Sequence, residues 1–217
     1  MSTCGVSFGL CAVRITKVDA AGNVVAGENA YVTDNPISVA VNPNIETGNA
    51  FSTRNGCGCS IARFRSPDTF NWWEFTFVKG TLEPEMEALL LGATTIEDSG
   101  DVVGLAFPST LACDEDEPAV ALEFWTQHIV GSGQDGTYPW IHWAFPKTIW
   151  QLGDNTMEED ILQPTLTGFS RTNTNWGEGP YGDGPPDSAD IREGGYWKTD
   201  VNPPDAECAA QAVTSTS

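Results

Sequence analysis

Alternating hydrophobic and polar residues predict several half-buried β-strands. In residues 11–18, Val13 and Ile15 fall on one face while Arg14 and Thr16 fall on the other, which is the period of a strand with one buried face. A chain with many such segments belongs to the mainly β or α+β class. The other predicted strands cover residues 37–41, 61–65, 72–78, 120–130, 140–150 and 161–169.

One segment has helical character. Pro84 suits the first turn of a helix, and Gly92 suits the position just after the last turn. Acidic residues near the start favour the same helix because they complement its dipole. We therefore expect one short α-helix in addition to the strands. Its acidic residues are Glu85 and Glu87, and its narrow apolar stripe is Met86, Leu89 and Leu90.

Polar segments interrupt the pattern in two places. Residues 42–58 are rich in Asn and Gly and predict a long loop that leaves the sheet. Residues 171–217 are rich in Gly, Pro and acidic side chains at first and then in small polar ones. They predict a loop-rich C-terminal region ending in an arm. Residues 1–217 are treated as a single domain.

The charge balance excludes one class of function. Thirty Asp and Glu face ten Lys and Arg, which gives a formal net charge of -20. Free binding of nucleic acid is disfavoured, because affinity for phosphate comes mainly from basic side chains. Hydrophobic residues make up 40% of the chain, so it is not a disordered acidic tail. Without a long apolar run or a signal-peptide pattern at the N-terminus, we expect synthesis in a cytosol and no membrane insertion.

The cysteines do not form a zinc pattern. Cys57 and Cys59 are separated by one residue, whereas structural zinc sites use wider pairs. Cys4 and Cys11 could approach them, but no second matched pair follows. We favour buried thiols and expect no metal or other cofactor, while the redox state of these cysteines stays open.

No catalytic constellation is apparent. His128 and His142 are the only histidines. They could face each other across a hairpin, but no nucleophile motif accompanies them. Acidic residues fall mostly in runs that are typical of solvated loops, so we expect no enzymatic activity. The carboxylates weighed for glycoside hydrolysis are Glu74, Glu123 and Glu158.

Six short stretches occur in a characteristic order. They are RITKVDAAGN (14–23), AYVTD (30–34), NGCG (55–58), EFWTQHIV (123–130), GTYPWIHWAFP (136–146) and LTGFSRTNTNWGEGP (166–180). In this order they resemble the major tail-tube proteins of long-tailed, siphovirus-type bacteriophages, especially those of actinobacterial hosts. The resemblance spans most of the chain.

The resemblance implies a mainly β fold, with a β-sandwich or barrel-like core and one short flanking α-helix. It also implies a structural virion protein made in the bacterial cytoplasm. Such subunits form hexameric rings that stack into a tail tube, and DNA is ejected through its electronegative lumen without specific binding. The expected partners are further copies of the chain and the tail-initiation, tape-measure and tail-terminator proteins. By position in the chain, the resemblance places inter-ring contacts at Asn44, Ile45, Glu46, Thr47 and Phe51.

Strand alternation supplies the candidates for the tube lumen. Glu123 and Gln127 share one face of the strand predicted for residues 120–130.

Two other functions stay open. A carbohydrate- or receptor-binding β-sandwich of the tail tip would have exposed Trp residues in a groove, and a β-sandwich glycosidase would need a pair of carboxylates.

Overall fold

The computed structural model describes residues 5–107, 117–153, 164–185, 191–206 and 210–213. Within them the protein is mainly β with a single short helix, which confirms the predicted fold class. The elements are β1 (Val6–Val18), β2 (Gly27–Thr33), β3 (Pro36–Glu46), β4 (Ala50–Arg54), β5 (Ser60–Arg65), β6 (Thr69–Lys79), α1 (Pro84–Leu91), β7 (Thr94–Asp98), β8 (Asp101–Ala106), β9 (Ala119–Val130), β10 (Gly133–Gln134), β11 (Trp140–Leu152), β12 (Thr165–Ser170), β13 (Gly195–Thr199) and β14 (Ala210–Val213).

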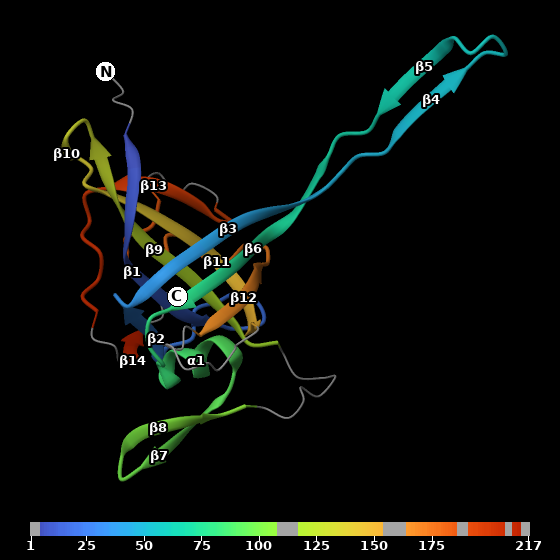
Figure 1. The fold of residues 1–217 in the computed structure, drawn as a ribbon. Coiled ribbons are helices and arrows are strands. Elements are labelled where there is room, and N and C mark those ends of the chain that lie inside the picture. Colours follow the sequence, from blue (N-terminus) through green and yellow to red (C-terminus); the bar gives the residue numbers. More distant parts are fainter. Residues whose placement is uncertain (1–4, 108–116, 154–163, 186–190, 207–209, 214–217) are drawn as a thin grey trace, which may run out of the picture.

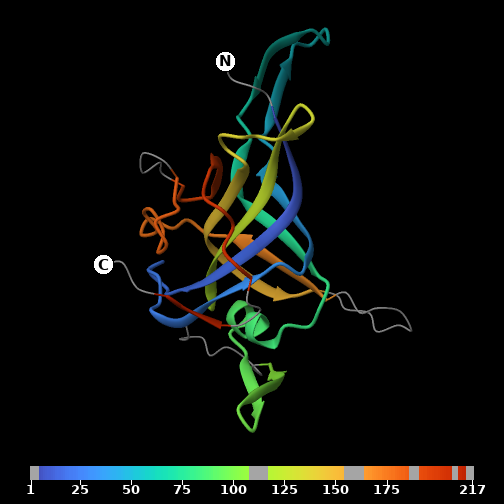
Figure 2. The same cartoon turned by 90° about the vertical axis from the view of Figure 1, so that its left-hand side faces the viewer.

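Ten of the described strands form one antiparallel sheet in the order β14-β2-β1-β9-β11-β12-β6-β3, with β10 added to β9 and β13 to β11. The sheet curls into a barrel-like body in which β3 comes close to β1 (Figure 1, Figure 2). The central strands β9 and β11 are rich in β-branched and aromatic residues, a composition that suits a pleated surface. Their inward side chains make the core.

The core inside the curl is strongly aromatic. Phe75 lies 4.8 Å from Phe145 in an edge-on arrangement and 5.7 Å from Trp150 in a stacked one, measured between ring centroids. Phe124 stacks on Trp143 at 5.6 Å. Such pairs add to the burial of apolar area that holds the sheet in its curled shape. Aliphatic residues complete this core, among them Val13, Ile15, Val120, Leu122 and Leu166.

The helix matches the prediction closely. It begins at Pro84 and ends at Leu91, and Gly92 follows in the left-handed conformation with φ 62°. Met86 and Leu90 are fully buried against the core inside the curl. The helix therefore covers one end of the barrel-like body (Figure 1). No helix among the described residues has the length and hydropathy needed to cross a membrane.

Two predictions about polar segments hold only in part. Residues 42–58 do leave the body, but β3 continues to Glu46 and β4 follows, so most of this segment is strand and not loop. The C-terminal part is rich in loops, yet β14 at Ala210–Val213 pairs with β2 instead of forming an arm. Backbone pairing with distant strands, which a local composition does not reveal, accounts for both. The strand predicted for 161–169 begins at Thr165 among the described residues.

Two hairpins project from the body. The first, called here the arm, comprises residues 47–67 and contains β4 and β5, and it extends the β3–β6 pair away from the sheet. The second, called the β7–β8 hairpin, follows α1. In both views they leave the body at opposite ends (Figure 1, Figure 2).

Candidate functional site

The arm is a solvated ribbon whose two faces differ in chemistry. Phe51 and Phe64 are direct cross-strand partners on one face, and their side chains are 63% and 65% exposed. Arg63 and Arg65 alternate with Phe64 along β5 and therefore fall on the other face. No body residue covers either face: every described residue of β4 and β5 is exposed. The arm offers a paired aromatic surface backed by guanidinium groups.

The arm has a net positive charge, opposite in sign to the net charge of the whole protein. Residues 47–67 contain Arg54, Arg63 and Arg65 and no acidic residue, in a chain of net charge -20. Three of the ten basic residues are thus concentrated on one projecting hairpin. A local positive patch on a strongly acidic protein attracts acidic surfaces and steers their approach.

Hydrogen bonds at the root of the arm fix its direction. The backbone N–H of Gly48 donates to Asp68 Oδ1 at 2.9 Å, and the guanidinium of Arg65 contacts the same carboxylate at 2.7 Å. These contacts lower the pKa of Asp68, the Gly48 hydrogen bond most of all. The backbone N–H of Ser66 donates to the carbonyl of Asn49 at 3.0 Å. The arm is therefore held to the β3–β6 ribbon by contacts on both of its strands.

The five residues expected at inter-ring contacts all lie on the arm or at its root. Ile45 and Phe51 are exposed and available to a partner. The amide of Asn44 is engaged within the chain, because it donates to Glu74 Oε1 at 2.6 Å and accepts from Asn71 at 3.0 Å. Asn44 therefore stiffens the root of the arm. The remaining two, Glu46 and Thr47, lie at the end of β3 and just beyond it and are exposed.

The cysteines at the tip of the arm correct another prediction. Cys57 and Cys59 are exposed free thiols, not buried ones. The side-chain oxygen of Asn55 accepts hydrogen bonds from the backbone N–H groups of both and shapes the turn. Cys11 is half-buried in β1, and burial raises its pKa. Cys4 lies outside the described residues, as do Cys113 and Cys208.

The lumen prediction for Glu123 is wrong, because this residue is buried. Its carboxylate accepts two hydrogen bonds at 2.8 Å from the guanidinium of Arg14 and lies 3.1 Å from His142 Nε2. Burial would raise the pKa of Glu123, but attraction to Arg14 and hydrogen bonds from His142 and Arg14 outweigh it and lower that pKa to about 2. Glu123 is an internal anion.

The C-terminal region buries this side of the sheet. The guanidinium of Arg14 contacts Asp183 at 2.8 Å and lies 3.7 Å from the ring centroid of Tyr181. The rings of Trp125 and Trp197 lie 4.1 and 4.3 Å from that of His142. Residues beyond β12 thus form a packed cover. Gln127, the other lumen candidate, is only half-buried on the same strand face.

The buried cluster around Glu123 contains three side chains grouped closely enough to resemble a metal site. Ligand atoms of Glu123, His142 and Asp183 lie within 4.8 Å of one another. The Arg14 guanidinium contacts both carboxylates, so the positive charge that these anions require is supplied by the protein itself. We interpret the cluster as a structural ion network that joins the cover to the sheet.

The two histidines do not meet. In the β9–β11 ladder, the Cα partner of His142 is Trp125, so His128, three residues further along β9, points to the other face. Its Nδ1 lies 2.9 Å from the carbonyl oxygen of Tyr138 and 3.4 Å from Asp135. Glu158, one of the carboxylates considered for hydrolysis, lies outside the described residues.

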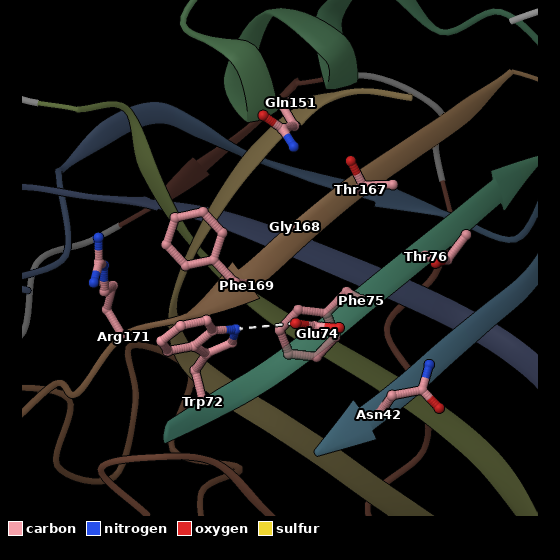
Figure 3. A pocket seen from close by; sticks show the side chains of 10 residues that line it. All are labelled: Asn42, Trp72, Glu74, Phe75, Thr76, Gln151, Thr167, Gly168, Phe169 and Arg171. Carbon is pink, nitrogen blue, oxygen red and sulfur yellow. Dashed lines mark hydrogen bonds between the residues drawn. The ribbon is translucent and has the colours of Figure 1, made fainter. Parts of the chain in front are cut away.

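The outer face of β3, β6 and β12 is a polar surface with a pocket of about 450 Å³ (Figure 3). Trp72 and Phe169 form one side of it, with ring centroids 6.4 Å apart. Glu74 Oε1 accepts a hydrogen bond from Trp72 Nε1 at 3.4 Å, drawn as a dashed line in Figure 3. Arg171 lies over the Phe169 ring at 4.8 Å. The polar side chains that complete the lining are Asn42, Thr76, Gln151 and Thr167.

Three features of these surfaces were missed by reasoning from the sequence: the charge of the arm, the β7–β8 hairpin and the cover over Glu123. For the arm a signal was present, because basic and apolar residues alternate in IARFR at 61–65.

Comparison with known protein families and with curated proteins gave no match for this chain.

Proposed function

We propose that this protein is a non-enzymatic structural subunit that assembles with copies of itself into stacked, six-membered rings, forming the tail tube of a long-tailed bacteriophage. The observation that carries the proposal is the arm, a projecting hairpin with an exposed aromatic pair, Phe51 and Phe64. The mainly β, barrel-like body and the order of the segments in the sequence support the same function.

The arm favours assembly because an isolated hairpin gains little stability in water. Two-stranded ribbons are marginal without a further strand or a packing surface, and every residue of β4 and β5 is exposed. Burying a Phe side chain is worth about 1.5–3 kcal/mol. A second copy that covers Phe51 and Phe64 would therefore stabilise both the arm and the assembly.

The proposal reassigns the lumen to the outer face of β3, β6 and β12. This face is polar and uncovered, and its central charged residue is Glu74. Cross-strand partners place Asn42 beside Glu74 and Thr167 beside Thr76. Amides and hydroxyls bind phosphate weakly, and this face carries one anion, Glu74, and one cation, Arg171, which lies over the Phe169 ring. Without a cluster of basic side chains, DNA would pass without being retained. The proposed location is the virion tail, with tail-initiation, tape-measure and tail-terminator proteins as partners.

Electron microscopy and sedimentation velocity of the purified protein test this function. We expect rings with six-fold symmetry or tubes built from them, either above a threshold concentration or after addition of a tail-initiation partner. Tubes whose inner surface is formed by β3, β6 and β12 would support the lumen assignment. A protein that stays monomeric at high concentration with that partner present would contradict the proposal.

The pocket beside Trp72 favours a second candidate, a carbohydrate- or receptor-binding protein of the tail tip. An exposed Trp next to amide and carboxylate side chains is a surface on which a sugar ring can stack and form hydrogen bonds. The two functions exclude each other on this face, because a lumen is closed to receptors. Binding of neutral oligosaccharides by a monomer, lost in Trp72→Ala and kept in Trp140→Ala, would favour the second candidate.

A further inference from the structure

The end of the body opposite the arm is strongly acidic. Residues 80–107, which include α1 and the β7–β8 hairpin, contain six Asp and Glu and no Lys or Arg. Glu97, Asp98 and Asp101 are exposed on the hairpin itself. The arm has the opposite composition, with three Arg and no acidic residue in 47–67. The protein therefore carries charges of opposite sign on hairpins at its two ends (Figure 1, Figure 2).

The acidic end also exposes apolar side chains around a hollow. A pocket of about 450 Å³ lies where the start of α1 meets β8, lined in part by Tyr31, Glu85 and Asp101. Leu82, also in its lining, is 64% exposed. On the hairpin, Ile96 and Val103 are 48% and 60% exposed. Acidic groups surrounding apolar surface complement an arm that combines Phe with Arg.

We propose that the arm of one copy docks on the acidic end of the next copy. The arm would lie between α1 and the β7–β8 hairpin of the next copy. Its aromatic face, with Phe51 and Phe64, would cover the exposed apolar side chains beside α1, and its opposite face, with Arg54 and Arg63, would be turned toward Asp98 and Asp101 on the hairpin. The inference rests on the proposed function, since it names the surface that receives the arm in a stack of rings.

The placement of the two hairpins determines the type of contact. The arm and the β7–β8 hairpin project from opposite ends in both views (Figure 1, Figure 2), so different surfaces of the two copies meet. Such a heterologous, head-to-tail contact repeats without closing on itself and builds an open stack. Because the charged groups are exposed, salt should weaken the contact.

A mixture of two variants isolates this single contact. In the first, Asp98→Arg and Asp101→Arg disable the acidic end and leave the arm intact. In the second, an Asn-Gly turn replaces residues 47–68, the arm together with Asp68, and leaves the acidic end intact; this is called the short-arm variant. Neither can stack on itself through the proposed contact, but together they can form one such contact. We expect a 1:1 complex at low salt by sedimentation velocity, and its loss at high salt.

A matched control separates the arm's charge from its shape. Adding Arg54→Glu and Arg63→Glu to the first variant should abolish the 1:1 complex. In the short-arm variant, which keeps Asp98 and Asp101, the charge reversals Asp200→Arg and Asp205→Arg lie outside the acidic end and should leave the complex intact. Arg65 is kept in every variant that retains the arm, because it already pairs with Asp68.

The outcomes distinguish this inference from the proposed function. No complex between the two variants at low salt would overturn the docking proposal, even if the wild type forms tubes. Suppose that the two variants form a complex but the wild type forms only short head-to-tail chains and never rings. The docking contact would then stand, and the proposed tail tube would be contradicted. A complex that survives reversal of the arm's arginines would show that charge does not select this surface, and would also overturn the proposal.

Discussion

Arg14 and Glu123 are direct cross-strand partners in the β1–β9 ladder, and their side chains form a bidentate ion pair with both N–O distances at 2.8 Å. Both side chains are almost fully buried. A bidentate pair of this kind has a geometry that Lys could not reproduce. It places a satisfied pair of charges between the sheet and the C-terminal cover.

Breaking this pair should destabilise the fold strongly. Glu123→Gln leaves the Arg14 guanidinium buried with only Asp183 as an anionic partner, and removal of one member of a buried pair costs about 3–5 kcal/mol. Because Asp183 remains, we expect a loss of about 3 kcal/mol in the free energy of unfolding, measured by urea denaturation. The double change Arg14→Met with Glu123→Leu should lose much less. A Glu123→Gln variant as stable as wild type would contradict the structural role.

The same pair predicts a dependence of stability on pH. The pKa of Glu123 is about 2 in the folded protein, below the ordinary value of 4.5 for a glutamate. A carboxylate whose pKa is lowered by folding stabilises the folded protein at pH values above its pKa in the unfolded chain. This stabilisation is lost as the pH falls through its pKa in the folded protein. We expect wild-type stability to fall between about pH 5 and pH 2. In Glu123→Gln the fall over this range should be smaller, which chemical denaturation at several pH values would show.

Removing the arm should separate folding from assembly. The short-arm variant keeps the β3–β6 pair up to Glu46 and Thr69, which are Cα partners, and an Asn-Gly turn suits a two-residue hairpin loop. Since no arm residue belongs to the core, we expect a folded protein with nearly unchanged thermal stability that does not stack into tubes. The control Cys57→Ser with Cys59→Ser should assemble normally. Normal tubes from the short-arm variant would contradict the role given to the arm.

Gly92 should be intolerant of substitution. It has φ 62°, and a Cβ at this position would lie 2.3 Å from Cγ of Pro118. Both the backbone strain and the clash oppose a side chain, so Gly92→Ala should lower the free energy of unfolding by at least about 1 kcal/mol. Gly56→Ala is the matched control, because a Cβ there meets nothing within 4 Å. Equal stabilities for the two variants would contradict this interpretation.

Glu74 tests the assignment of the lumen. It is exposed on the polar face, so Glu74→Lys should change stability by no more than about 0.5 kcal/mol beyond the loss of its hydrogen bonds to Asn44 and Trp72. In assembled tails the added cation should bind DNA phosphates and slow ejection, most strongly at low salt. The control Asp200→Lys should eject at the wild-type rate. Identical ejection rates for the two variants at every ionic strength would contradict the assignment.

Sequence patterns predicted the elements that pack against the core and failed where packing is absent or indirect. The strands around Phe124 and Phe75 and the helix from Pro84 follow from periodicity, because one face of each is buried. The arm has no buried face; its second strand, β5, matches the strand predicted for 61–65, but β4 lies in a segment that was predicted as loop. Glu123 alternates with apolar residues like a solvated position, but a cover from distant sequence buries it.

The β1–β9 pairing has a consequence for the order of events during synthesis. Arg14 and Glu123 are 109 residues apart, and pairings between distant segments form slowly because a long chain must close first. The arm is a local hairpin and leaves the ribosome well before β9. An unfinished chain therefore displays its aromatic, positively charged arm while the body that anchors it is still incomplete. Mutual repulsion between the arms of neighbouring nascent chains would keep these chains apart until each body has folded.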